Sequence, residues 1–134
     1  MAKHFVQIML LAAVSDGKID GEEEQLIRTY RNLYPPIRDI SEAEFKNELV
    51  VLNNRLHAGM KLNHIVEDIG DNLNEKQKNI AYALAVEMCF CNFFLRPEEK
   101  VLLETIETQW KIKQTVVSAL RRSAQLRYEK NPDL

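Results

Sequence analysis

Three acidic side chains lie close together in the sequence VSDGKIDGEE, residues 14–23: Asp16, Asp20 and Glu23. Gly17 can adopt the positive φ of a tight turn, and Asp20 with Glu23 three residues later resembles the capping box that begins a helix. If the chain turns here, the three carboxylates meet at one corner and could hold a hard divalent cation weakly. The simpler interpretation, which we favour, is a solvated acidic cap at the positive end of the helix dipole.

The residues before this turn exclude a working EF-hand. An EF-hand loop that ends with Glu23 as its bidentate ligand would place Ala12 and Val14 at its first two ligand positions. Neither residue has a side-chain oxygen, and strong calcium binding requires one at each of those positions. Any ion site here must therefore be a weaker one, completed by carbonyl oxygens of the turn.

The other residues with reactive side chains do not form a recognisable catalytic or metal-binding pattern. Cys89 and Cys91 are two positions apart and would point to different sides of a helix, so we expect buried thiols rather than a disulfide or a metal pair. His4, His57 and His64 are scattered without ligand spacing. Since no Gly-rich phosphate loop occurs either, we expect a protein that is not an enzyme and has no organic cofactor.

Phe93 and Phe94 are the aromatic residues that could contact a partner. They follow a long apolar run and precede Arg96-Pro97, where a turn between two helices is expected. Aromatic side chains at such a turn are either additional core or a contact patch. For Trp110, near the end of a predicted helix, the simplest interpretation is an anchor at the edge of the core.

The elements that position these residues are predicted to be helices only, because no stretch alternates polar and apolar residues with a period of two. Pro35-Pro36 should end one helix, SEAE at residues 41–44 and Asn74 should cap two others, and Pro97 should start another. About seven helices result, all in one α-helical domain over residues 1–134. They cover approximately residues 3–14, 21–34, 42–58, 61–69, 75–91, 97–110 and 114–129.

Two parts of the chain resemble each other at a shift of 76 residues. The shift places Asp20-Gly21-Glu22-Glu23 over Arg96-Pro97-Glu98-Glu99, and the apolar runs that precede these segments also superpose. We therefore predict two helix–turn–helix repeats, at about 3–34 and 74–110, facing each other. Helices within about 41–70 would bridge the repeats, and a C-terminal helix at about 114–129 would follow.

The pattern AVSDGKID at residues 13–20, followed by Glu23 and echoed in the second half, resembles the TerB-like family. That family includes the tellurite-resistance protein TerB and the N-terminal region of DjlA-type co-chaperones. The resemblance implies an all-α, non-enzymatic stress-response or interaction domain, with Asp16, Asp20 and Glu23 carried over as metal or partner ligands. The alternative is a metal-independent protein-binding or co-chaperone-type module. The second turn departs from the family's acidic pattern, with Asn92, Phe93, Phe94 and Arg96 in its place, which weakens the metal interpretation.

Composition and charge limit the class of protein further. With 134 residues, 46 % apolar and 28 % charged, the chain fits one ordinary globular domain. A net charge of −2 argues against a general nucleic-acid binder. Residues 111–130 hold six Lys or Arg and one Glu, and residues 15–24 hold five acids and one Lys. These regions could pair within the fold, across a homodimer or, through Arg121, Arg122 and Arg127, with an acidic protein partner.

The N-terminal apolar run, residues 5–14, is superficially similar to a short secretion signal. Gln7 interrupts it, and an equivalent run lies deep inside the chain, so we expect a buried helix instead. No apolar segment has the length that spanning a bilayer requires. Together with two unpaired cysteines, these features favour a cytoplasmic protein.

Overall fold

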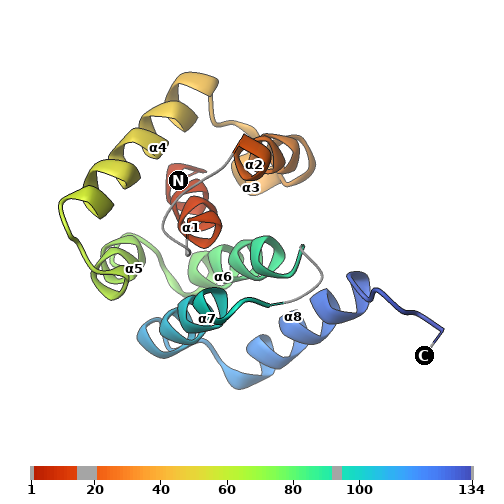
Figure 1. Ribbon diagram of the computed structural model, residues 1–134. Helices are drawn as coiled ribbons and strands as arrows, with labels where there is room; N and C mark the ends of the chain where they lie inside the picture. The colour runs from red at the N-terminus through yellow and green to blue at the C-terminus, as the bar shows by residue number, and fades with distance from the viewer. Residues whose placement is uncertain (1, 15–20, 92–94, 134) are drawn as a thin grey trace.

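The computed structural model describes residues 2–14, 21–91 and 95–133, with all their side chains except those of residues 21–23. In these residues the chain forms α-helices and no strand, which confirms the predicted all-α class (Figure 1). None of the described helices is both long and apolar enough to cross a membrane. The helices are α1 Ala2–Ala13, α2 Gly21–Leu33, α3 Pro35–Arg38, α4 Glu42–His57, α5 Leu62–Gly70, α6 Glu75–Phe90, α7 Pro97–Gln109 and α8 Gln114–Arg127.

Side-chain caps fix where two of the long helices begin. At α4 the Ser41 hydroxyl accepts a bond from the Glu44 backbone N–H at 3.1 Å. At α6 the Asn74 side chain accepts from the Gln77 backbone N–H at 2.9 Å, and the Gln77 side chain bonds back to the Asn74 N–H. Each cap satisfies backbone donors that a helix leaves without partners in its first turn. These starts are where the sequence predicted them.

The helix α3 is the one element of the described chain that the sequence analysis did not predict. Pro35 and Pro36 end α2, as expected, because neither ring can continue its hydrogen-bond ladder. The same two residues then occupy the first positions of a short new helix, where a missing N–H has no cost. Ile37 is fully buried, so this turn adds a side chain to the core.

The centre of the molecule is the pair α1 and α6. Helix α1 packs against α2, α3, α4, α5 and α6, and α6 in turn packs against α7 and α8 (Figure 1). Eight of the twelve residues of α1 are buried, as its nearly continuous apolar sequence predicts. The first helices of the two predicted repeats, α1 and α6, are thus in direct contact. They form the hydrophobic core around which the other helices lie.

Trp110 joins α7 to α5 at a position where α5 has no side chain. The indole Nε1 donates a hydrogen bond to the Val66 carbonyl at 3.0 Å, and the ring is buried. A Cβ atom placed on Gly70 would lie 2.2 Å from that Nε1, which is far inside van der Waals contact. Gly70 is therefore required for close approach of the indole, and Trp110 is the core anchor that its apolar size predicted.

Candidate functional site

The residues that the sequence analysis assigned to a site fall outside what the structure describes. Asp16, Asp20, Phe93 and Phe94 lie in the two segments outside the described residues, and Glu23 lies on α2 with a side chain that is likewise outside them. Among the described side chains, no group of three or more His, Cys, Asp or Glu is arranged to hold a metal ion. The metal and aromatic sites therefore remain predictions.

A groove between α6 and α8 is the candidate site that the described residues form. It is a shallow, open depression of about 470 Å³, lined mainly by apolar side chains and alkyl groups. Two half-buried side chains of α8, Val116 and Leu120, face Ile80 of α6 across it. The remaining lining residues are Lys76, Asn79, Ala83, Thr115 and Ala119.

The two helices run in the same direction along this groove. Glu75 at the start of α6 pairs with Lys113 just before α8, and Glu87 near the end of α6 pairs with Arg127 at the end of α8. Ala83 and Ala119 lie between these two ion pairs and have no side chain beyond Cβ, so the floor stays open in the middle. Leu126, which is 61 % exposed, is seven residues from Ala119 and so extends the apolar face of α8.

A buried carboxylate cluster closes one end of the groove. Glu87 is only 6 % exposed. Its Oε1 accepts hydrogen bonds from the hydroxyls of Tyr34, at 2.9 Å, and Tyr128, at 2.5 Å. Its Oε2 accepts from the Arg127 guanidinium at 2.6 Å. The Tyr30 hydroxyl lies 3.3 Å from that of Tyr128, so the cluster joins α2, α6 and the end of α8.

These contacts set the protonation of the cluster. Burial alone would raise the pKa of Glu87, but the bonds from Tyr128, Arg127 and Tyr34 outweigh it and hold that pKa below its ordinary value. Burial and the adjacent carboxylate raise the pKa of Tyr34 to about 12. Burial also raises the pKa of Tyr30 and of Tyr128. At neutral pH the cluster is thus one carboxylate, one guanidinium and three neutral hydroxyls.

The opposite end of the groove is solvated and carries exposed charges. Lys113 and Glu75 are 3.6 Å apart, and their side chains are 72 % and 74 % exposed. Ion pairs this exposed contribute little to stability. Lys76 is also exposed and lines the groove, and no ion pair to it is formed by the carboxylates that the structure describes. The groove is therefore closed at the Glu87 end and open and positive at the Lys76 end.

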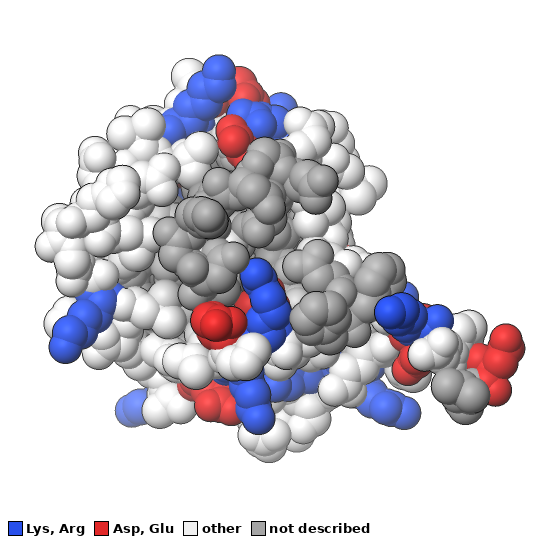
Figure 2. All heavy atoms as spheres, viewed as in Figure 1, with Lys and Arg blue, Asp and Glu red and all other residues white. Residues whose placement is uncertain are grey.

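Two of the three arginines predicted as a basic partner face are engaged within the fold. Arg121 donates two hydrogen bonds to Glu107 Oε2 on α7, at 3.0 and 2.6 Å, and Tyr82 donates to the same oxygen at 2.5 Å. Arg127 is held by Glu87, as above. Of the predicted set, Arg122 alone is both exposed and outside the ion pairs of the described residues. Positive and negative side chains are interspersed over the described part of the face shown in Figure 2.

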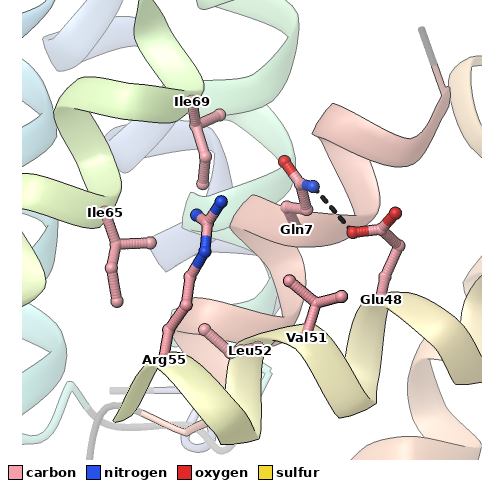
Figure 3. Close-up of a pocket in the computed structure, with 7 residues that line it drawn as sticks. All are labelled: Gln7, Glu48, Val51, Leu52, Arg55, Ile65 and Ile69. Atoms are coloured by element: carbon pink, nitrogen blue, oxygen red, sulfur yellow. Dashed lines mark hydrogen bonds between the residues drawn. The ribbon is translucent and has the colours of Figure 1, made fainter. Parts of the chain in front are cut away.

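A second cavity, between α1, α4 and α5, has room for no more than about one water molecule. Its volume is about 10 Å³. The Gln7 side-chain amide donates to Glu48 at 2.7 Å across its edge, and Arg55 extends along it toward Ile69 (Figure 3). Because this space is already filled by protein side chains, we assign it a packing role.

The two cysteines have the structural surroundings that their spacing predicted, and no disulfide joins them. Cys89 is fully buried, and burial raises the pKa of its thiol, which keeps the thiol protonated and unreactive. Cys91 is partly buried, and its Sγ donates to the Met88 carbonyl at 3.1 Å.

Sequence reasoning missed Glu87, although a signal for it was present. It is the one charged residue in the run Ile80–Cys91, and a carboxylate within an apolar helical run indicates a buried charge with partners. Its partners lie 40 to 53 residues away in sequence, so they could not be identified from spacing. Comparisons with protein-family models, with curated proteins and with solved structures found no match for the chain.

Proposed function

We propose that this chain is a non-enzymatic interaction domain that binds a helix of a partner protein in the groove between α6 and α8. The observation that carries the proposal is the open apolar floor between two parallel helices, formed by Ile80, Val116 and Leu120 with alanines between them. A third helix packs into such a groove through residues at i, i+3, i+4 and i+7, which is a common mode of peptide recognition.

The energy available from this floor indicates a reversible interaction. Full burial of one aliphatic side chain contributes roughly 1.5–3 kcal/mol, and Ile80, Val116 and Leu120 are already half buried in the free protein. Completing their burial would therefore contribute about 1 kcal/mol each. With the partner's own side chains added, and the loss of freedom on association subtracted, we expect a dissociation constant on the order of micromolar.

Site-specific photo-crosslinking tests this proposal. A photoreactive phenylalanine analogue at position 79, where a polar side chain already lines the groove, should give discrete adducts in a lysate of the source organism. The same analogue at the exposed position 118 points away from the groove side of α8 and serves as the control. The partner identified in this way is then purified and titrated against the wild type, Ala119→Gln and Ser118→Gln.

We expect Ala119→Gln to weaken binding about tenfold or more, because a polar side chain then occupies the floor. Ser118→Gln should bind like the wild type. Equal adducts at both positions, or equal affinity of the two variants, would contradict the proposal.

The TerB-like resemblance supports an alternative function, in which Asp16, Asp20 and Glu23 bind a divalent metal ion weakly. The support is the sequence pattern itself, with three carboxylates inside eight residues at a predicted helix start. Such a domain would act in a stress response, with the ion organising the turn for a partner. Without an ion, the same domain is a metal-independent interaction module of the co-chaperone type.

Thermal melts distinguish these two forms of the domain. An ion that binds the native state alone, supplied at about a hundred times its Kd, should raise the free energy of unfolding by about 2.7 kcal/mol over an EDTA-treated sample. Calcium, magnesium, manganese and zinc are tested separately. The gain should disappear in Asp16→Ala and Asp20→Ala and persist in Asp68→Ala, which removes an exposed carboxylate on α5. No shift with any of the four ions would eliminate the metal alternative.

A further inference from the structure

We infer that the occupant of the α6–α8 groove is an acidic amphipathic helix, with its carboxylates directed toward Lys76 and Lys113. This inference rests on the proposed function, because it specifies the partner of the same groove. Three features of the described residues support it: the positive charge of the lysines at the open end of the groove, the direction of the two helices, and the small residues along the floor.

The groove side chains that lack a strong ion-pair partner among the described residues are positively charged. At the closed end, Arg127 and Glu87 neutralise each other at 2.6 Å. At the open end, the ion pair that Lys113 forms within the described residues is to the exposed carboxylate of Glu75, 3.6 Å away, a contact that a second carboxylate can replace at little cost. Lys76 lines the groove and forms no ion pair with the described carboxylates. A partner that carries negative charge at this end gains attraction, and a basic partner meets repulsion.

The direction of the helices adds to this charge. Because α6 and α8 are parallel, both begin at the Lys76 end. The α6 N-terminus is capped by Asn74 and carries Glu75 in its first turn, whereas α8 has no acidic residue in its first turn, so the partial positive charge of the α8 N-terminus is the one that adds to the lysines. Lys113, at the N-cap of α8, provides no side-chain acceptor for the first-turn N–H groups of that helix. The two lysines and the α8 N-terminus thus outweigh the negative charge of Glu75 at this end of the groove, while Arg127 and Glu87 neutralise each other at the other end.

The shape of the floor selects a helix. The lining residues Ala83, Thr115 and Ala119 have short side chains, and they lie among the larger apolar side chains of Ile80, Val116 and Leu120. A ridge of side chains on a partner helix fits between two parallel helices, and the small residues allow its backbone to approach closely. A nucleic acid would place phosphates over this apolar floor with few cations to neutralise them, so we assign the groove to a protein helix.

Fluorescence anisotropy with three labelled synthetic peptides tests the inference. The first is an Ala-rich helix with leucines at i, i+3, i+4 and i+7 and glutamates on its flanks. The second has the same leucines with lysines in place of the glutamates, and the third keeps the glutamates but scatters the leucines. Each is titrated with the wild type and with the variants Lys76→Glu, Arg122→Glu, Ala119→Gln and Ser118→Gln. Arg122→Glu is the matched charge reversal, on an exposed residue of α8 outside the groove.

We expect the acidic amphipathic peptide to bind about tenfold more tightly than the basic one, with a preference that weakens as salt is added. Lys76→Glu should weaken its binding about fivefold, and Arg122→Glu less than twofold. The scattered peptide should not bind. Ala119→Gln should weaken binding about tenfold or more, whereas Ser118→Gln should leave it unchanged.

The outcomes separate this inference from the proposed function. If the basic peptide binds as tightly as the acidic one and Ala119→Gln still weakens binding about tenfold or more, the groove is a helix site but the acidic partner is wrong. If Lys76→Glu and Arg122→Glu have equal effects, the placement of the carboxylates is wrong. If no amphipathic peptide binds, or if Ala119→Gln has no effect, both the acidic partner and the proposed groove are overturned.

Discussion

At the scale of single residues, Glu87 links the stability of the fold to pH. A buried charge is tolerated when its hydrogen-bonding capacity is satisfied, and Glu87 receives two tyrosine hydroxyls and one guanidinium. Its folded-state pKa is lowered from the ordinary value of 4.5. The stabilisation it provides is therefore complete above that value and is lost as the pH falls through the lower folded-state pKa.

We predict that Glu87→Gln lowers the free energy of unfolding by about 1–3 kcal/mol at pH 7, because the amide cannot replace the charge-assisted bonds. The difference from the wild type should shrink as the pH falls below 4.5, because the carboxylate becomes protonated first in the unfolded state and then, at its lower pKa, in the folded state. Urea denaturation at several pH values measures this. Glu104→Gln, at an exposed position of α7, should match the wild type throughout. A difference between Glu87→Gln and the wild type that stays constant from pH 7 to pH 3 would contradict the assignment.

At the scale of helices, the contact between α5 and α7 depends on the absence of a side chain at Gly70. Alanine in place of glycine ordinarily stabilises a helix by roughly 0.5–1 kcal/mol. Here a Cβ would lie 2.7 Å from Trp110 Cδ1 and closer still to Nε1, so the rigid indole ring would have to move. The bond from that nitrogen to the Val66 carbonyl would then be lost as well.

We therefore predict that Gly70→Ala destabilises the protein by about 1–3 kcal/mol, opposite in sign to the usual effect in a helix. The cost should be smaller when the same change is made in a Trp110→Phe background, because the smaller ring leaves more room. A double-mutant cycle by chemical denaturation measures this coupling. Additive effects of the two substitutions would show that the close approach is not the cause.

The starts of the helices could be predicted from sequence, whereas the site could not. Ser41, Asn74 and Pro97 are local signals, and the structure places helix starts at all three. The short α3 was missed because consecutive prolines signal a helix end at least as strongly as a start. Val116 and Leu120 belong to the apolar stripe of α8, and in the structure they line an open groove while remaining partly buried. A periodic apolar stripe indicates which side of a helix is apolar, but the number of neighbouring helices that cover it is a tertiary property.

At the scale of the whole molecule, α1 is the common contact of most other helices. It packs against α2 to α6, and its side chains at Val6, Ile8, Met9 and Leu10 are fully buried. Helix α8 reaches the same core through α6, and α7 reaches it through α5 and α6. A loss of packing in α1 should therefore weaken the fold as a unit.

We predict that Leu10→Ala lowers the free energy of unfolding by about 2–5 kcal/mol. Native-state hydrogen exchange should show the loss of protection equally in α1, α6 and α8. Val50→Ala, at a position of α4 that is 55 % exposed, should change stability by no more than about 0.5 kcal/mol. Unchanged protection in α8 would instead indicate that α7 and α8 unfold as a separate cooperative unit.

The chain has a single tryptophan, and its buried indole is set against Gly70 with its N–H bonded inside the protein. Its emission should consequently be blue-shifted in the native state and move to longer wavelength when the core opens. Trp110 lines a pocket beside the groove with Asn79 and Lys113, so the emission of each variant is compared in the absence of ligand. A groove variant that loses its ligand while keeping native emission has therefore lost recognition alone, and one whose emission shifts has lost its fold.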